Sequence, residues 1–267
     1  MRASLLPRVA VLAAVGWLAG VAPAAAANQA QLSYVGYLAG APVLTLSANI
    51  AVPEGTRPGD GPYTIAADIA TTGNLAALYP YTQSLQATGS LHGGKARPAN
   101  YQSTMRVWSR QEFVALSYGA DGSVGIRAVP LTRQAQMAQE QGYARGTMDP
   151  ASLVVAVATL FSNAGNCNGQ YQLFDGARRY DLTLAQGGYA DLDAMPNSYY
   201  AGSATECSAT PQLVAGFQQS ALNANLYPQS ATLWMAPAIA GFPAVPVRIL
   251  AQSAFGPMTL ELVNVTR

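Results

Sequence analysis

The sequence is poor in charged side chains and in the residue types that most often do chemistry. Only 10% of its 267 residues are charged, against about 25% in an average soluble domain. It contains one lysine, Lys95, and one histidine, His92. With 14 basic and 13 acidic residues its formal net charge is +1. The clustered basic surface that nucleic-acid binding requires is therefore not expected.

The scarcity of histidine and cysteine restricts both catalysis and metal binding. A Ser-His-Asp triad would have to use His92, which lies in the Gly-rich stretch Gly89–Gly94 and is expected at the surface. One histidine and two cysteines do not supply a typical zinc site. The acidic pair Asp191 and Asp193 falls short of the ligand number of a calcium loop. We therefore predict no catalytic residue, no metal site and no cofactor.

The first 27 residues have the pattern of a secretory signal peptide. Arg2 and Arg8 give a positive start, 13 apolar residues follow from Val9 to Val21, and small residues lead to Ala27. As a helix, the apolar stretch would be about 20 Å long, which is too short to span a bilayer. We predict cleavage after Ala27. The product is then a periplasmic or secreted protein, residues 28–267, without a transmembrane anchor.

The two cysteines, Cys167 and Cys207, lie well inside the exported part of the chain. An even pair in an oxidising compartment predicts one disulfide bond. Such a bond closes a loop of about 40 residues and stabilises the fold by about 4 kcal/mol in the chain-entropy model. A reactive or redox-active pair is less favoured, because there is no Cys-x-x-Cys spacing and no neighbouring base.

Most of the chain after residue 27 alternates apolar and polar residues over short runs that end at Gly, Pro, Asn or Asp, as antiparallel strands do. The predicted strands are 32–37, 43–52, 63–71, 84–91, 101–108, 112–118, 124–129, 171–174, 178–184, 212–217, 231–235, 245–251 and 258–265. The stretch 131–146 is expected to be a mobile connection, and the stretch 185–210 is expected to be irregular. Without a repeat or a shift in composition, we predict one mainly β domain, a single antiparallel curved sheet or open barrel.

One segment predicts a helix, from Pro150 to Ser162. Asp149 is a good N-cap residue, and Pro150 suits the first helical position, where its missing N–H is not needed. The segment is apolar on nearly all sides, so we expect it to be buried and to fill the hollow of the curved sheet.

A set of segments spread over the chain carries a resemblance to known proteins. These segments are Asp149–Leu153, Phe174–Asp181, Tyr200–Gly202, Cys207, Val214–Phe217, Trp234–Pro237 and Val245–Ile249, with a looser match over Tyr34–Leu46 and Gly89–Arg106. Together they resemble a family of exported bacterial proteins, domain of unknown function 3108, whose helix start Asp-Pro-x-Ser-Leu and hairpin Phe-Asp-Gly-x-Arg-Arg-Tyr-Asp are the most specific of the shared motifs. The resemblance implies an exported β-rich domain, a curved open barrel similar to the lipoprotein-carrier chaperones of the bacterial envelope. It implies no reaction.

Four charged residues of the hairpin, Asp175, Arg178, Arg179 and Asp181, form the candidate cluster. Asp before Gly at a turn usually satisfies its own backbone, and residues 179 and 181 share one face of a strand, where they can neutralise each other. A structural role is therefore favoured. Alternatively, Arg178 binds an anionic head group or the carboxylate of a partner, or the two acids act as a glycosidase pair.

These features favour a non-enzymatic protein of the cell envelope. It would bind a lipid-like, apolar ligand or a cell-envelope protein in or on its curved sheet. Tyr79, Tyr81, Tyr199 and Tyr200 fall near turns, where they either contact such a ligand or pack at the ends of strands. The alternatives are an envelope hydrolase that uses Asp175 and Asp181, and a purely structural protein without a ligand.

Overall fold

The computed structural model describes residues 27–267 except residues 196, 221–226, 228 and 254–255. The predicted signal peptide lies outside the described residues, apart from Ala27, which begins the first strand. The elements are β1 (Ala27–Leu38), β2 (Ala41–Pro53), β3 (Gly61–Thr71), α1 (Gly73–Leu78), β4 (Tyr81–His92), β5 (Lys95–Val107), β6 (Arg110–Tyr118), β7 (Val124–Val129), α2 (Arg133–Gln141), α3 (Pro150–Ala164), β8 (Gly169–Phe174), β9 (Arg179–Leu192), β10 (Gly202–Ala215), β11 (Ala231–Ala236), β12 (Val245–Ser253) and β13 (Gly256–Thr266).

The strands form one 13-stranded antiparallel sheet in the order β7-β6-β5-β4-β3-β2-β1-β13-β12-β11-β10-β9-β8. Almost every strand pairs with its neighbours in sequence, and the exception is the pairing of β1 with β13, the last strand. We call β1–β7 the N-terminal wing and β8–β13 the C-terminal wing. Because β7 and β8 end the order without pairing with each other, the sheet is not closed into a barrel. The predicted single antiparallel, curved sheet is confirmed.

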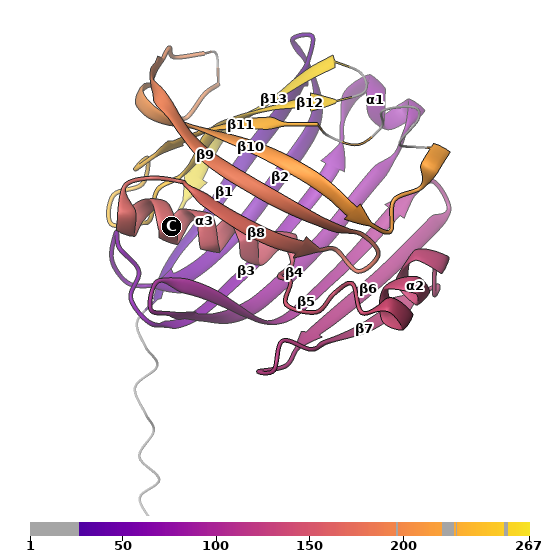
Figure 1. Cartoon of the computed structure of the whole chain (residues 1–267). Coiled ribbons are helices and arrows are strands. Elements are labelled where there is room, and N and C mark those ends of the chain that lie inside the picture. Colours follow the sequence, from indigo (N-terminus) through magenta and orange to yellow (C-terminus); the bar gives the residue numbers. More distant parts are fainter. Residues whose placement is uncertain (1–26, 196, 221–226, 228, 254–255) are drawn as a thin grey trace, which may run out of the picture.

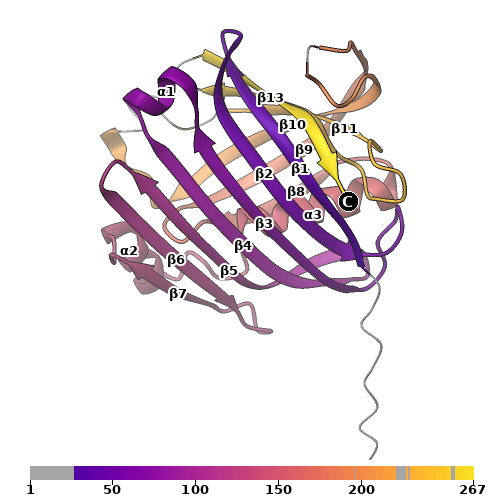
Figure 2. The same ribbon diagram turned by 180° about the vertical axis from the view of Figure 1, so that it is seen from behind.

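Helix α3 lies in the hollow between the two wings. It is seen in front of the N-terminal wing in Figure 1 and behind that wing in Figure 2, and it contacts β3, β4, β5 and β8. The helix runs two residues past the predicted end and stops at Gly165, which has a left-handed φ of 69°. The predicted buried helix is therefore confirmed, and it determines where the interior has room.

Polar groups at the start of α3 are buried beneath the sheet. Asp149, which is fully buried, accepts hydrogen bonds from the Ser152 backbone N at 2.7 Å and from Ser152 Oγ at 2.8 Å. The Tyr63 hydroxyl donates in turn to Ser152 Oγ at 2.8 Å. Burial raises the pKa of Asp149, and the hydrogen bonds from Ser152 oppose that rise. The cap predicted at Asp149 thus also joins the helix to β3.

Two stretches contain more regular structure than the sequence predicted. Within 131–146 lies α2, which begins with a hydrogen bond from the Ala135 N–H to the Thr132 side chain and ends at Gly142, with φ 68°. The stretch 185–210 belongs largely to β9 and β10, which pair with each other over most of their length. Its Ala, Gly, Ser and Thr residues have weak strand preferences alone, and the long cross-strand pairing overrides them.

Candidate functional site

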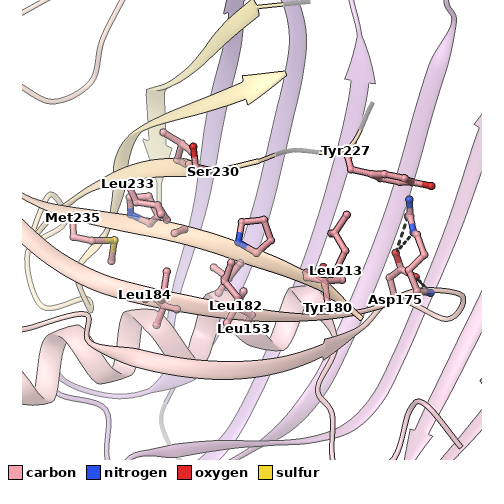
Figure 3. Close-up of a pocket in the computed structure, with 18 of the residues that line it drawn as sticks. Leu153, Asp175, Tyr180, Leu182, Leu184, Leu213, Tyr227, Ser230, Leu233 and Met235 are labelled. Atoms are coloured by element: carbon pink, nitrogen blue, oxygen red, sulfur yellow. Dashed lines mark hydrogen bonds and ion pairs between the residues drawn. The ribbon is translucent and has the colours of Figure 1, made fainter. Parts of the chain in front are cut away.

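A pocket of about 420 Å³ lies between α3 and strands β9–β12 of the C-terminal wing. Figure 3 shows its lining side chains converging from the helix and from the strands. Most of them are apolar. The helix contributes Leu153, Val154 and Val157, and β12 contributes Pro246 and Ile249.

The sheet side of the pocket follows from the period of two along each strand, which turns alternate side chains to the same face. Three strands each present three such positions, and antiparallel pairing aligns them in rows: Leu184 opposite Ala209, Leu182 opposite Pro211 and Tyr180 opposite Leu213. The lining positions are Tyr180, Leu182 and Leu184 on β9, Ala209, Pro211 and Leu213 on β10, and Ala231, Leu233 and Met235 on β11. The wall is thus a grid of side chains of regular spacing.

The deep end of the pocket is fixed by the predicted disulfide. Cys167 and Cys207 are joined by a bond of 2.05 Å, with their Cα atoms 6.2 Å apart, and both residues are fully buried. They pack in one cluster with Leu184 and Met235, which also line the pocket. The bond joins β10 to the segment before β8, so it restrains the strands at the deep end of the pocket. The described residues contain no free cysteine.

The opposite end carries the ion pair between Arg178 and Asp175. Arg178 Nη2 lies 2.7 Å from Asp175 Oδ2, and Nε donates to the same oxygen at 2.8 Å. The other oxygen, Oδ1, accepts from the backbone N–H groups of Ala177 at 3.0 Å and Arg178 at 2.8 Å. Asp175 therefore does satisfy its own turn, as predicted. The Arg178 side chain is 44% exposed, so this end of the pocket faces solvent.

Two glycines let the β8–β9 turn pack closely. Gly176 has φ 103°, and a Cβ there would overlap the side chain of Val114 on β6. Gly216, after β10, has φ 81°, and a Cβ there would overlap the carbonyl oxygen of Ala177. The turn that carries Arg178 is thus clamped between the two wings, which limits its movement relative to the pocket.

The second half of the candidate cluster faces the other way. Arg179 Nε lies 3.3 Å from Asp181 Oδ1, so these two residues share a face of β9 as predicted. Arg179 Nη1 also donates to the carbonyl oxygen of Tyr143 at 3.3 Å. Because Tyr180 lines the pocket and side chains alternate along a strand, Asp181 points away from the pocket. The structure thus divides the cluster into two ion pairs on different faces.

This division bears on the hydrolase hypothesis. A glycosidase needs both carboxyl groups on the two sides of one scissile bond, within about 10 Å of each other and facing the same cleft. Here Asp175 lines the pocket and Asp181 does not, and each is paired with an arginine. The arrangement does not favour catalysis by these two acids.

A second apolar cavity, of about 220 Å³, lies between α3 and strands β1–β4. It shares Val154, Pro246 and Ile249 with the first pocket, so the two spaces adjoin around α3. Burial raises the pKa of the Tyr34 phenol on its wall, which keeps that side chain uncharged. Unfilled apolar space therefore lies on both sides of the helix.

Exposed aromatic rings lie beyond the Arg178 end. A groove lined by Tyr79 and Trp108 shares Arg178 and Tyr227 with the pocket. The rings of Tyr79 and Trp108 meet edge to face, with centroids 4.9 Å apart, and Trp108 is 64% exposed. Tyr81 stacks on Tyr79 at 6.4 Å. Two of the four loop tyrosines singled out in the sequence thus lie beside the mouth of the pocket.

The remaining residues considered from the sequence lie elsewhere. His92 ends β4, and its side chain is 62% exposed, with Nδ1 3.0 Å from Asp60 Oδ2. Asp191 and Asp193 are exposed, and the described residues contain no group of three or more potential metal ligands. Tyr199 and Tyr200 do not line the pocket.

Sequence reasoning missed part of the pocket wall. Ala209 was assigned to an irregular stretch, and Tyr227 and Ser230 were not considered. A signal was present, because Cys207, Ala209, Pro211 and Leu213 are spaced by two and so share one face of a strand. Alanine and proline weaken that signal, since both are depleted in strands.

Comparisons with known proteins assign neither a family nor a function. No family model and no curated protein matches the chain. One similar solved structure is the crystal structure of a β-barrel-like protein of domain of unknown function DUF1849 from Brucella abortus. It is 10% identical, covers 89% of this chain and 96% of its own, and has a TM-score of 0.47. None of the described helices is long and apolar enough to cross a membrane.

Proposed function

We propose that this chain is an exported, non-enzymatic protein of the cell envelope that binds a lipid-like apolar chain between α3 and the C-terminal wing. The observation that carries the proposal is the pocket of about 420 Å³ with an almost wholly apolar wall. This volume lies in the usual range for small-molecule sites, about 300–1,000 Å³. Such a wall gains free energy when it is covered by hydrocarbon rather than by water.

The disulfide supports the proposed export of the protein, and the resemblance noted in the sequence supports the proposed family. The bond between Cys167 and Cys207 is compatible with an extracellular or periplasmic location. Membership of the domain of unknown function 3108 family remains our proposal. In its favour, the resembling segments meet at the pocket: they supply the lining residues Leu153, Asp175, Arg178, Tyr180, Phe217, Met235, Pro246 and Ile249.

The direct test is native mass spectrometry of the protein purified gently from an exporting host, followed by organic extraction. We expect a reproducible additional mass of lipid size. The purified protein should also bind the uncharged fluorophore N-phenyl-1-naphthylamine, and linear alcohols should displace it. Each added methylene should improve their affinity about fourfold until the pocket is filled, since burying one contributes about 0.8 kcal/mol.

A matched pair of variants connects binding with this pocket. Leu182→Trp places a larger side chain in the middle of the wall, whereas Thr183→Trp adds the same group on the exposed face of the same strand. We expect the first to weaken fluorophore and decanol binding at least tenfold and the second to leave it unchanged. A protein that carries no lipid and binds neither probe would overturn the proposal and favour a structural or partner-binding role.

A further inference from the structure

The polar side chains of the pocket gather at its open end. Asp175, Arg178, Tyr180 and Tyr227 lie together there, and Ser230 is the other polar residue of the wall. Figure 3 shows Tyr227 facing the ion pair across the mouth, and the Arg178 guanidinium carbon lies 5.9 Å from the centre of the Tyr227 ring. A ligand that fills this pocket therefore meets polar groups at one end of its length.

The hydrogen-bonding capacity at this end is unevenly used. Asp175 accepts from four donors, two backbone N–H groups and the Nε and Nη2 groups of Arg178. This uses the roughly four acceptor sites of a carboxylate. Arg178 has donors on three nitrogens, and among the described residues no group accepts a hydrogen bond from its Nη1. The open end therefore has spare donors and no spare carboxylate acceptor.

Tyr180 adds a further hydrogen-bond donor at this end of the pocket. Burial raises the pKa of its phenol, and the nearby Asp175 carboxylate raises it further. The side chain therefore stays protonated and keeps a hydrogen to donate. A head group that accepts hydrogen bonds therefore suits this end better than a quaternary ammonium, which would lie beside the positively charged Arg178 and could not accept its hydrogen bonds.

Building on the proposed function, we infer that the natural ligand is a single-chain amphiphile whose head group is an oxyanion, a carboxylate or a phosphate monoester, held by Arg178. Arginine is the side chain best suited to planar oxyanion recognition. The two ends of the pocket differ in exposure, and this difference gives the orientation of the ligand. Arg178 is 44% exposed, whereas Leu184 and Met235 at the other end are 3% and 1% exposed. The head lies at the solvent end and the chain runs toward the disulfide.

Asp175 takes part as a positioning residue. Its Oδ2 binds both Nε and Nη2 of Arg178, and its Oδ1 is held by the turn backbone. The guanidinium is thus aligned before a ligand arrives, so less conformational entropy is lost on binding. Although the pair carries no net charge, a head group held by Arg178 lies closer to the guanidinium than to the Asp175 carboxylate, so the local positive charge and the arrangement of donors together favour the oxyanion.

The test compares four probes with the same chain: decanol, decanoate, decyl phosphate and decyltrimethylammonium, each displacing N-phenyl-1-naphthylamine below its micellar concentration. We expect decanoate or decyl phosphate to bind about tenfold or more tightly than decanol, as one charge-assisted hydrogen bond predicts. The tighter of these two identifies the source of the oxyanion. Arg178→Met should reduce that affinity to the level of decanol, and Arg178→Lys should give an intermediate value.

Arg179→Met is the matched control, because its side chain faces away from the pocket; it should leave all four affinities unchanged. Should Arg178→Met not fold, the wild-type protein still tests the inference: the preference for the oxyanion over decanol should shrink from 0.01 M to 1 M salt, while decanol binding should not weaken. Equal binding of decanol and both oxyanions overturns this inference and leaves the proposed function standing. Failure of all four probes to bind overturns the proposed function itself.

Discussion

Removal of the Cys167–Cys207 bond is the sharpest test of what holds the pocket together. The closed loop contains β8, the whole of β9, the turn that carries Arg178 and the first part of β10. Its sequence separation of 40 corresponds to about 4 kcal/mol of stability in the chain-entropy model. That is a large part of the 5–15 kcal/mol that ordinarily separates a folded domain from its unfolded chain.

The double variant Cys167→Ala with Cys207→Ala avoids buried hydroxyl groups at two fully buried sites. We expect its free energy of unfolding to fall by about 4 kcal/mol, measured by urea titration with tryptophan fluorescence. Ser208→Ala, at an exposed position beside one cysteine, is the control and should change stability by less than about 0.5 kcal/mol. A loss below about 1 kcal/mol in the double variant would refute the reasoning.

Three further predictions concern the interior, each measured by urea unfolding. Gly89→Ala should destabilise the protein by about 3 kcal/mol, because its Cβ would overlap the carbonyl oxygen of Arg97; Gly59→Ala, with open space around it, should be neutral. Burial raises the folded-state pKa of Asp149 above 3.8, so the contribution of Asp149 to stability falls as the pH rises from 3.8 through the folded-state pKa. Asp149→Asn should remove this dependence on pH. A wild-type advantage over that variant that grows with pH would contradict this. Val154→Leu adds a methylene beside both cavities, so it should stabilise the empty protein by about 1 kcal/mol and weaken decanol binding; unchanged stability and binding would contradict it.

The strands and α3 were predictable because their signals are local. On β3 the buried residues Tyr63, Ile65 and Ala67 are spaced by two, as one buried sheet face requires. Asp149 and Pro150 mark the start of α3 by cap chemistry alone. Such patterns depend on a few consecutive residues, so no knowledge of the rest of the chain is needed.

The order of the strands depends on contacts between the two ends of the chain, which local patterns do not contain. Nothing in Leu32 or Val265 alone indicates that these residues pair across β1 and β13. The pocket likewise depends on distant contacts, since it needs one face of α3 opposite strands β9–β12. The candidate cluster was located correctly at the hairpin, but only the assembled wings show that Arg178 faces the pocket and Arg179 does not.

The space around α3 follows from the side chains that the helix presents to the curved sheet. Ala151, Val154, Val155 and Ala158 are small, and they leave the cavity of about 220 Å³ beside the open pocket. Covering its apolar walls with hydrocarbon contributes about 25 cal/mol per Å² of surface removed from water. Larger side chains on α3 would recover this free energy. The side chains of this fold leave apolar space beside α3. We propose that the hydrocarbon chain of a ligand fills this space.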